Sequence, residues 1–359
     1  MARPSWWIGA LLGATFAAAA PLLAEVPPCG SQPNDSLVSA MANETQAVGS
    51  ASNGQWLQTP SEACCPPCDR KLGVIGYADY LNWKAGLRGL DFAMVTRAPL
   101  VIPPLPMATE SLNFDGSNGI RAGLGYRFSS NWDITWNYTY FRDDTSGAVV
   151  DSGLLNTVLL SPRSAFDTTP MTAIQADASL WLSIHDIEAN YYACLDDAVS
   201  FRMFGGLRVA QLDQEFTTAY TFRDSATRGA ISLPSQMEAA GGRLGGEIRR
   251  RWQGGWRVFG RGGISYLSAD FRTQQREIVV NQVAIGGQTG VPQVILDLDQ
   301  TTTRFLSVLE GAAGIGWARG PVEIDAGYEM NSWINVLGAN GVTQDLLVRG
   351  FFLRLAYVH

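Results

Sequence analysis

The sequence has little charge, almost no lysine or histidine, and no long apolar run beyond its first two dozen residues. Charged residues make up 16% of the 359-residue chain, below the roughly 25% that is usual for soluble proteins. No later stretch supplies 18 consecutive apolar residues, which excludes transmembrane helices. The formal net charge of −7 argues against general nucleic-acid binding. Lys71 and Lys84 are the only lysines, so arginine supplies nearly all of the 26 basic residues, and arginine suits ordered ion-pair networks.

The first 24 residues have the three parts of a secretory signal peptide. Arg3 provides the positive start, residues 6–20 are apolar, and Ala24 ends a plausible cleavage site. The alternative is an N-terminal membrane anchor, but the apolar run is short for a span of about 20 residues. The sequence therefore predicts export, with residues 25–71 forming a mostly irregular periplasmic linker.

Four of the five cysteines lie in this linker, where disulfides are permitted. The Cys65-Pro-Pro-Cys68 spacing resembles a redox motif, but no thioredoxin-like βαβ pattern surrounds it, and Asp69 replaces the histidine of a haem attachment site. Zinc binding and unpaired thiols remain alternatives. The predicted disulfide candidates are Cys29, Cys64, Cys65 and Cys68.

From about residue 72 to the end of the chain, apolar and polar residues alternate. In the stretch 120–128 the even positions are apolar, and after a three-residue turn the same pattern continues over 132–140. Neighbouring side chains of a strand point to opposite faces, so each such segment has one apolar and one polar face. Short turns at 129–131, 195–197, 253–255 and 318–320 alternate with long connections at 142–180, 223–236, 272–303 and 336–345.

Residues 72–359 are therefore predicted to form an all-β, transmembrane, antiparallel up-and-down barrel with long extracellular loops. About ten strands are expected, near 73–83, 118–128, 132–142, 181–193, 199–222, 237–252, 256–272, 304–317, 321–333 and 346–358. The 199–222 segment exceeds a single crossing of about 9–11 residues, so we expect it to extend above the membrane. The bounds are eight to twelve strands, because residues 89–97 also alternate and twelve result if they cross.

Alternation would equally suit a soluble barrel with its apolar face inward, and the aromatic residues favour a membrane. They gather at the ends of the apolar stripes, as interfacial girdles do: Trp132, Tyr140, Trp181, Trp252, Trp256, Tyr266, Trp317 and Trp333. The last strand places Phe351, Leu353, Leu355 and Tyr357 on one face, similar to the C-terminal signal that barrel-assembly machinery recognises. These features predict an outer-membrane location.

The strands also resemble a known family. The residues that carry the resemblance are the segments 77–83, 90–93, 119–128, 132–133, 138–141, 185–188, 204–208 and 326–329. They are similar to the Lpg1974 family of pore-forming outer-membrane proteins, related to the Legionella major outer-membrane protein. The resemblance spans roughly 73–358 and implies a porin-like role; it supplies no catalytic residues.

The polar faces of the strands are rich in arginine and carboxylates. Two interpretations remain open: a charged pore that passes ions or small solutes, or an ion-pair network that fills a small barrel. By this count ten arginines, which include Arg249 and Arg251, oppose eight acids, so a conducting lumen would weakly prefer anions. The candidate pore-lining residues are Arg121, Arg127, Asp133, Asp186, Glu188, Arg202, Arg208, Arg243, Glu247, Arg257, Arg261, Glu310, Glu323, Asp325, Glu329 and Arg354.

No pattern of catalytic residues emerges. His185 precedes Asp186, but neighbouring strand residues face opposite ways, and neither a zinc spacing nor a phosphate-binding loop is present. The sequence thus predicts a porin-like channel without cofactor, metal or enzymatic activity. Its expected partners are membrane lipid, the assembly machinery and small solutes. The alternative is a closed structural or adhesive barrel that presents long surface loops.

Overall fold

The computed structural model describes residues 72–96, 108–150, 156–158, 171–196, 198–222, 227–281, 290–338 and 343–358. They belong to one structural unit, which runs from Ser61 to His359. The predictions for the signal peptide and for the 25–71 linker lie outside the described residues. Within them, no helix is long and apolar enough to cross a membrane.

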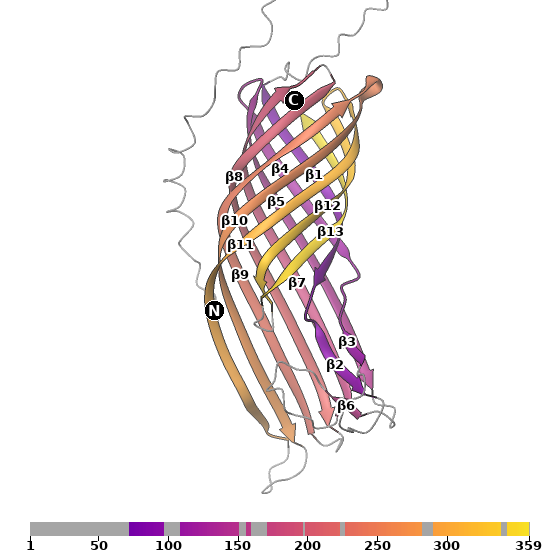
Figure 1. Cartoon of the computed structure of the whole chain (residues 1–359), viewed down its shortest axis with the longest axis vertical. Coiled ribbons are helices and arrows are strands. Elements are labelled where there is room, and N and C mark those ends of the chain that lie inside the picture. Colours follow the sequence, from indigo (N-terminus) through magenta and orange to yellow (C-terminus); the bar gives the residue numbers. More distant parts are fainter. Residues whose placement is uncertain are drawn as a thin grey trace, which may run out of the picture. The chain divides into compact units, whose positions relative to one another are not determined.

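Ten strands close into an antiparallel ring (Figure 1). Their order is β7-β5-β4-β1-β13-β12-β11-β10-β9-β8, and β8 pairs with β7 to complete the circle. The closure removes sheet edges wherever all ten strands are present. The ring strands are β1 (Gly73–Leu87), β4 (Ser117–Arg127), β5 (Trp132–Val150), β7 (Met171–Cys194), β8 (Val199–Phe222), β9 (Thr227–Arg251), β10 (Trp256–Asn281), β11 (Pro292–Arg319), β12 (Val322–Leu337) and β13 (Thr343–Val358).

The predicted all-β barrel of about ten strands is confirmed, and the twelve-strand alternative is wrong. The described part of this segment, residues 89–96, does not add a strand to the ring. It contains β2 (Asp91–Thr96), which pairs with β3 (Ala108–Ser111) and with β6 (Asn156–Val158). This small sheet extends from the outer end of β7. The alternation in this segment instead places Phe92 in a buried cluster.

The strands differ greatly in length, and this difference overturns part of the loop prediction. Strands β7 to β11 have 24 to 28 residues, whereas β1, β4, β12 and β13 have 11 to 16. Much of the chain predicted as loops at 142–180, 223–236 and 272–303 continues the strands instead. The ladder between β10 and β11, for example, runs without a gap from Trp256 to Glu277. The predicted extension of 199–222 above one crossing agrees with the pairing of β8 along its length.

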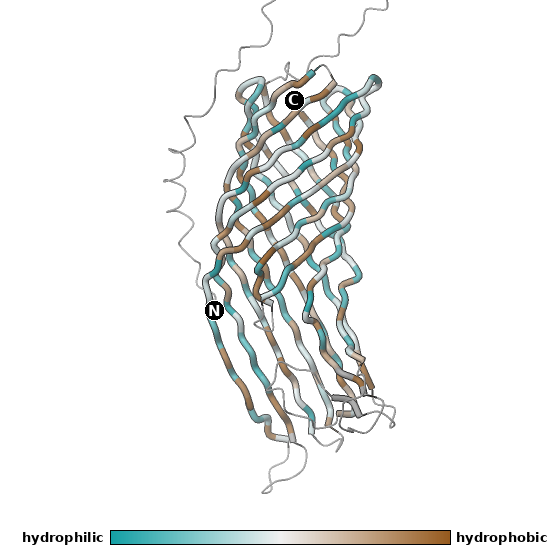
Figure 2. The backbone as a smooth tube through the Cα atoms, viewed as in Figure 1, coloured by the Kyte–Doolittle hydropathy of each residue, from teal (hydrophilic) through white to brown (hydrophobic). Residues whose placement is uncertain are grey.

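The sequence predicts loops for these residues because their outward positions are not consistently apolar. Threonine, glutamine, serine and charged residues occur on the outward positions there, so the apolar outer stripe ends. Figure 2 shows hydrophilic and hydrophobic residues interspersed along the strands. Cross-strand hydrogen bonding does not need that stripe, since β-sheets form equally with a polar outer face. The five long strands and the upper part of β5 therefore form a tall wall on one side of the barrel.

Apolar side chains cover the outside of the ring near the short turns. Leu124 is 58% exposed, and Phe351, Leu353 and Leu355 of β13 are also exposed, as the alternation predicts. Exposed apolar surface of this extent marks contact with lipid. Inward-facing residues are polar over the same height and become apolar farther from the short turns.

One member of the predicted aromatic girdle is wrongly placed. Trp333 on β12 is 0% exposed and belongs to the apolar cluster inside the barrel, whereas Trp256 and Tyr266 face outward. The alternation of β12 itself places Trp333 on the inward face, which it shares with Asp325 and Glu329, so its assignment to the outer girdle contradicted the pattern.

Candidate functional site: the charged barrel interior

The barrel interior holds a polar chamber of about 660 Å³. It extends from the level of Trp83 and Ile184 to the short turn at Gly320 and Pro321. Side chains from most strands of the ring line it, because every second residue of each strand points inward. Arginines and carboxylates dominate the lining, so the chamber can accommodate water, ions and small polar molecules.

The first ion-pair group centres on Asp79 and Glu329. Arg354 forms a bidentate pair with Asp79, at 2.7 and 2.8 Å, and Arg121 lies 3.1 Å from the same carboxylate. Arg121 also pairs with Glu329 at 2.8 Å, and Arg261 reaches Glu329 at 3.2 Å. The group joins β1, β4, β10, β12 and β13 across the lumen. Bidentate pairs of this kind are among the stronger polar contacts.

A second group occupies the opposite wall. Arg208 donates two hydrogen bonds to Asp186, at 2.7 and 2.8 Å, and lies 2.7 Å from Glu310. Arg243 pairs with Glu310 at 2.6 Å and also with Glu188. Glu310 of β11 thus connects two arginines from β8 and β9. The shared carboxylate offsets the cost of removing both guanidinium groups from water.

A third group lies nearer the short turns. Arg257 pairs with Asp325 at 2.6 Å and with Glu323 at 2.8 Å. Glu247 pairs with Arg202 at 3.2 Å and with Arg249. Since each of these acids faces one or two arginines, the network holds the side chains in fixed positions around the chamber.

One arginine stands outside this pairing. Arg251 lines the chamber but has no ion pair among the described residues, and its Nε has no hydrogen-bond partner there. Arg127, by contrast, pairs with Asp133 at 3.3 Å, and Asn190 donates to the same carboxylate at 2.8 Å. Arg251 therefore places a positive charge at the chamber that no carboxylate of the described residues pairs with.

All sixteen candidate pore-lining residues face the interior of the barrel. The structure adds three inward-facing carboxylates that the sequence analysis missed: Asp79 at the chamber, and Asp143 and Glu277 farther from the short turns. Asp79 shares the inward face of β1 with Tyr77 and Leu81. The alternation of that strand would have identified it. Around the chamber, with Asp79 included, ten arginines face nine carboxylates: Arg121, Arg127, Arg202, Arg208, Arg243, Arg249, Arg251, Arg257, Arg261 and Arg354 against Asp79, Asp133, Asp186, Glu188, Glu247, Glu310, Glu323, Asp325 and Glu329.

Trp83 lies where the polar chamber ends. Its indole N–H donates to Glu329 at 3.1 Å, and the guanidinium of Arg121 lies 5.5 Å from its ring centre. On the other side its ring packs edge-on against Phe141, with centroids 5.5 Å apart. The side chain is only 1% exposed, so it joins the ion-pair network to the apolar layer above it.

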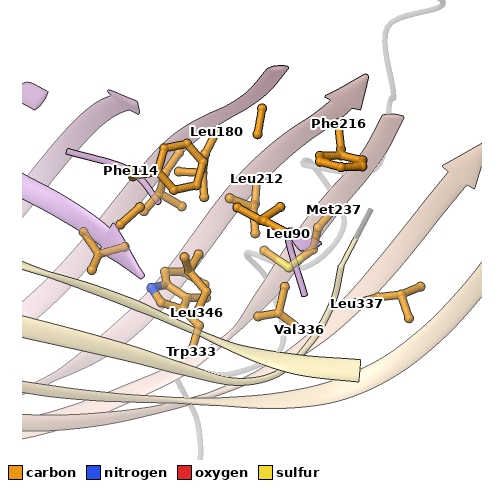
Figure 3. Close-up of a cluster of buried hydrophobic side chains, with 14 of the residues drawn as sticks. Leu90, Phe114, Leu180, Leu212, Phe216, Met237, Trp333, Val336, Leu337 and Leu346 are labelled. Carbon is orange, nitrogen blue, oxygen red and sulfur yellow. The ribbon is translucent and has the colours of Figure 1, made fainter. Parts of the chain in front are cut away.

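That apolar layer fills the barrel beyond the chamber (Figure 3). Inward-facing residues of the ring such as Leu212, Met237, Trp333 and Leu346 are almost wholly inaccessible to solvent. An open aqueous channel would leave such residues exposed to water in its lumen. The segment between β1 and β4 adds further side chains to the layer, namely Leu90, Phe92, Leu112 and Phe114. The lumen is thus closed at this level in the structure.

The histidine and metal predictions can be placed on the structure. His185 points outward and stacks near Trp136, with ring centroids 6.1 Å apart, while Asp186 points inward to Arg208. The barrel wall therefore separates the two adjacent residues. Among the described residues, no group of three or more metal-ligating side chains is found.

Cys194, at the end of β7 next to a short turn, is in a disulfide. The sequence analysis did not include it among the disulfide candidates. Its partner lies outside the described residues, as do Cys29, Cys64, Cys65 and Cys68. Cys194 is far in sequence from the other four cysteines, so sequence distance alone does not group it with them. In the barrel it lies at the short-turn end, where β1 also begins.

A closed ring with an apolar outer belt and a charged interior defines the class of outer-membrane β-barrels. The chain belongs to the family described as Legionella pneumophila major outer membrane protein precursor, whose model matches residues 67–359. No curated protein sequence matches the chain.

Solved structures of similar architecture include outer-membrane proteins of several bacteria. The outer membrane protease OmpT from Escherichia coli is 8% identical, with 80% of this chain and 98% of that chain covered and a TM-score of 0.41. Neisserial surface protein A is 12% identical, with 80% and 97% covered and a TM-score of 0.29. The attachment invasion locus protein Ail of Yersinia pestis is 10% identical, with 80% and 98% covered and a TM-score of 0.22.

Proposed function

We propose that this outer-membrane barrel is a gated pore for ions or small solutes, described here in its closed state. The observation that carries the proposal is the charged chamber of about 660 Å³ inside the ring. A barrel that needed only a packed interior would be filled by side chains along its whole height, as small barrels are. The chamber instead leaves a polar space at the level of the lipid-facing belt. The resemblance to the pore-forming Lpg1974 family points the same way.

In this proposal the apolar layer is the gate. Phe92 and Phe114 come from the segment between β1 and β4 and not from the ring itself. Such a segment can move without breaking the closed ladder of the ten ring strands. Opening would expose the chamber to the outer medium, while the ion pairs below keep the barrel wall in place.

The uncompensated arginines would set the ion preference. Arg251 has no ion pair in the described part of the chain, and Arg261 has a single one, at 3.2 Å to a carboxylate that Arg121 also uses. Both line the chamber. Charged side chains along a lumen select permeating ions by their sign, so we expect a weak preference for anions.

Single-channel recording in planar bilayers tests the pore. We expect small, intermittent currents for the unmodified barrel and more frequent opening when Phe92 and Phe114 are both replaced by serine. Val150→Ser, at an exposed apolar position of the tall wall, is the matched control and should leave the current unchanged. A folded barrel that passes no current in any lipid, with or without the double substitution, would reject the pore.

Ion preference needs a second measurement. Under a salt gradient, Arg251→Gln combined with Arg261→Gln should shift the reversal potential toward cations. Arg251 has no ion pair among the described residues, and Glu329 keeps Arg121 as its partner when Arg261 is replaced. The double variant should therefore keep the heat-modifiable gel mobility of a folded barrel. An unchanged reversal potential in a conducting, folded variant would retain the pore and refute the role of these arginines.

The second candidate is a closed barrel that presents its outer end to the surroundings. The apolar layer favours it, because side chains such as Trp333 and Val348 are 0% exposed and pack as in a stable core. The same recordings separate the two candidates, since this one requires that no current flows.

A further inference from the structure

The tall wall ends in a strand edge that has no neighbour among the described residues. β10 pairs with β11 from Pro292 to Trp317. β12 pairs with β11 only from Ser307 to Arg319. Residues 292–306 of β11 therefore have a strand on one side only, within the part of the chain that the structure describes. Figure 1 shows β10 and β11 continuing well beyond the ends of β12 and β13.

The gap arises because β12 turns into the barrel. Asn335 has a φ of 69°, in the left-handed region, and its amide donates to the side chain of Asp345 at 3.2 Å. The register between β12 and β13 shifts at the same place. Val336 and Leu337 follow, and both are buried in the apolar layer. Burying these residues stabilises the interior but removes the strand that would otherwise continue beside β11.

The free edge has two chemically different faces. Leu296 and Leu298 form a short apolar stripe on the inward side, where Leu298 is about half exposed. A register shift at Ile295 places Val294 on the outward side, opposite Ile278. Asp297 and Asp299 lie on the outward side. Arg272 of β10 donates to Asp299 at 3.0 Å and holds the pKa of that carboxyl below its usual value. Asp297 has no ion pair in the described part of the chain. An added strand would thus meet an apolar stripe and a carboxylate.

Proteins normally protect such an edge with proline, lysine, a bulge or a covering loop. Between residues 292 and 306 there is no lysine, the only proline is the first residue, Pro292, and the register shift in the pairing with β10, at Ile295, lies near that same end. Arg304 contacts Thr343 at the end of the gap nearest to β12, so residues 292–303 have no second strand beside them among the described residues. A long edge with free backbone donors and acceptors is a template for pairing with another strand.

We propose that residues 292–304 of β11 bind an extended segment of another protein by strand addition. The partner segment would carry apolar side chains on one face and basic side chains on the other, to match the stripe and Asp297. A second copy of this chain fits less well, because its own β11 edge would bring carboxylates against carboxylates, and like charges in cross-strand positions are destabilising. The proposal does not depend on whether the barrel conducts.

A designed peptide tests the edge on the full-length barrel. The peptide is Lys-Val-Thr-Val-Lys-Val-Thr-Val-Lys with a fluorescent label, and the readout is its anisotropy with the barrel in detergent. We expect saturable binding with a Kd in the micromolar range. Amide hydrogen exchange should slow in residues 292–304 when the peptide is bound. A peptide of the same composition with its valines contiguous should bind at least about tenfold more weakly, since the stripe requires alternation.

Backbone methylation of the peptide distinguishes strand addition from non-specific binding. Two further peptides carry N-methyl groups on alternate residues, one on each edge of the strand. Only the edge that pairs with β11 needs its N–H groups, so one methylated peptide should bind like the parent and the other should not bind. The proposal is overturned if both methylated peptides bind equally, or if both bind as weakly as the peptide with contiguous valines.

Substitutions in the barrel locate the site. Leu296→Lys places an inward-pointing charge on the edge strand, a natural device against strand addition, and should weaken peptide binding by about tenfold or more. Val150→Lys, on β5 and equally remote from the ion-pair network, is the matched control and should bind as the unmodified barrel does. Equal loss in both variants would overturn the assignment to β11.

Self-association is the competing outcome. If the unmodified barrel forms dimers by analytical ultracentrifugation that Leu296→Lys abolishes, the occupant is a second copy and the proposed foreign partner is wrong. A monomeric barrel that binds the alternating peptide supports the proposal.

Discussion

Leu124→Arg would test the assignment of the lipid-facing side of the wall. Leu124 lies on the outer face of β4, midway between Ile120 and Phe128, which face the same way. Four residues at about 3.3 Å each, on a strand tilted by about 40°, place it roughly 10 Å from either end of that apolar stripe. The lipid-facing band is about 25 Å tall, so Leu124 lies near its middle.

The expected cost follows from that depth. An arginine near the bilayer midplane of a barrel costs about 2–4 kcal/mol of folding free energy, falling to about 0–1 kcal/mol at the interface. Leu124 is 58% exposed and has Gly76 and Trp136 as cross-strand neighbours. No acid is opposite it, so the new charge gains no ion pair across the ladder.

Chemical unfolding of the barrel in lipid vesicles, followed by tryptophan fluorescence, measures this cost. Gln211→Arg is the matched control: Gln211 also faces outward, lies on β8 beyond Val209, and has Glu238 as its cross-strand neighbour. We expect it to change the free energy of unfolding by less than about 1 kcal/mol. Equal costs for the two variants would refute the placement of Leu124 in the lipid-facing belt.

Three further outcomes are expected. Arg127→Met leaves the buried Asp133 with Asn190 but no cation, so it should lower the free energy of unfolding by about 3–5 kcal/mol in the same denaturation assay. Replacing both partners, as Arg127→Met with Asp133→Leu, should lower it less, and a larger loss in this double variant would contradict the ion-pair argument. Gly123→Ala should destabilise the barrel, because a Cβ there would lie 2.3 Å from the ring of Tyr77, while Gly242→Ala, with nothing within 4 Å, should not; melting temperatures decide. The mature chain should begin near Glu25, and a retained Met1 would exclude export processing. A non-reducing digest should contain Cys194 in a disulfide-linked peptide, and thiol labelling of all five cysteines without reductant would exclude the disulfide.

The local pattern of the sequence was enough to determine the class of fold. Alternation with period two depends only on strand geometry, so each ring strand, its inner and outer faces and the inward position of residues such as Arg121 could be predicted. The change between short and long connections also indicated a ring of about ten strands, and the outward face of the last strand, including Phe351, agrees with the structure.

Strand length was less predictable, since hydrogen bonding between strands continues where the lipid-facing stripe stops. The parts of β9, β10 and β11 far from the short turns have polar outer faces, which led to a prediction of loops, although their backbones pair throughout. The composition of a strand indicates whether its outer face meets lipid or water, but it does not indicate where the neighbouring strand ends.

Only the tertiary structure determined which groups meet across the lumen. Asp79 and Arg354 lie 275 positions apart in the chain, and their pairing requires that β1 and β13 close the ring. The same closure brings Phe92 and Trp333 into one apolar layer, and the inward turn at Asn335 leaves the edge of β11 free. Alternation states which face a side chain occupies, but opposite walls are brought together by the tilt and register of the complete barrel, which no single strand encodes.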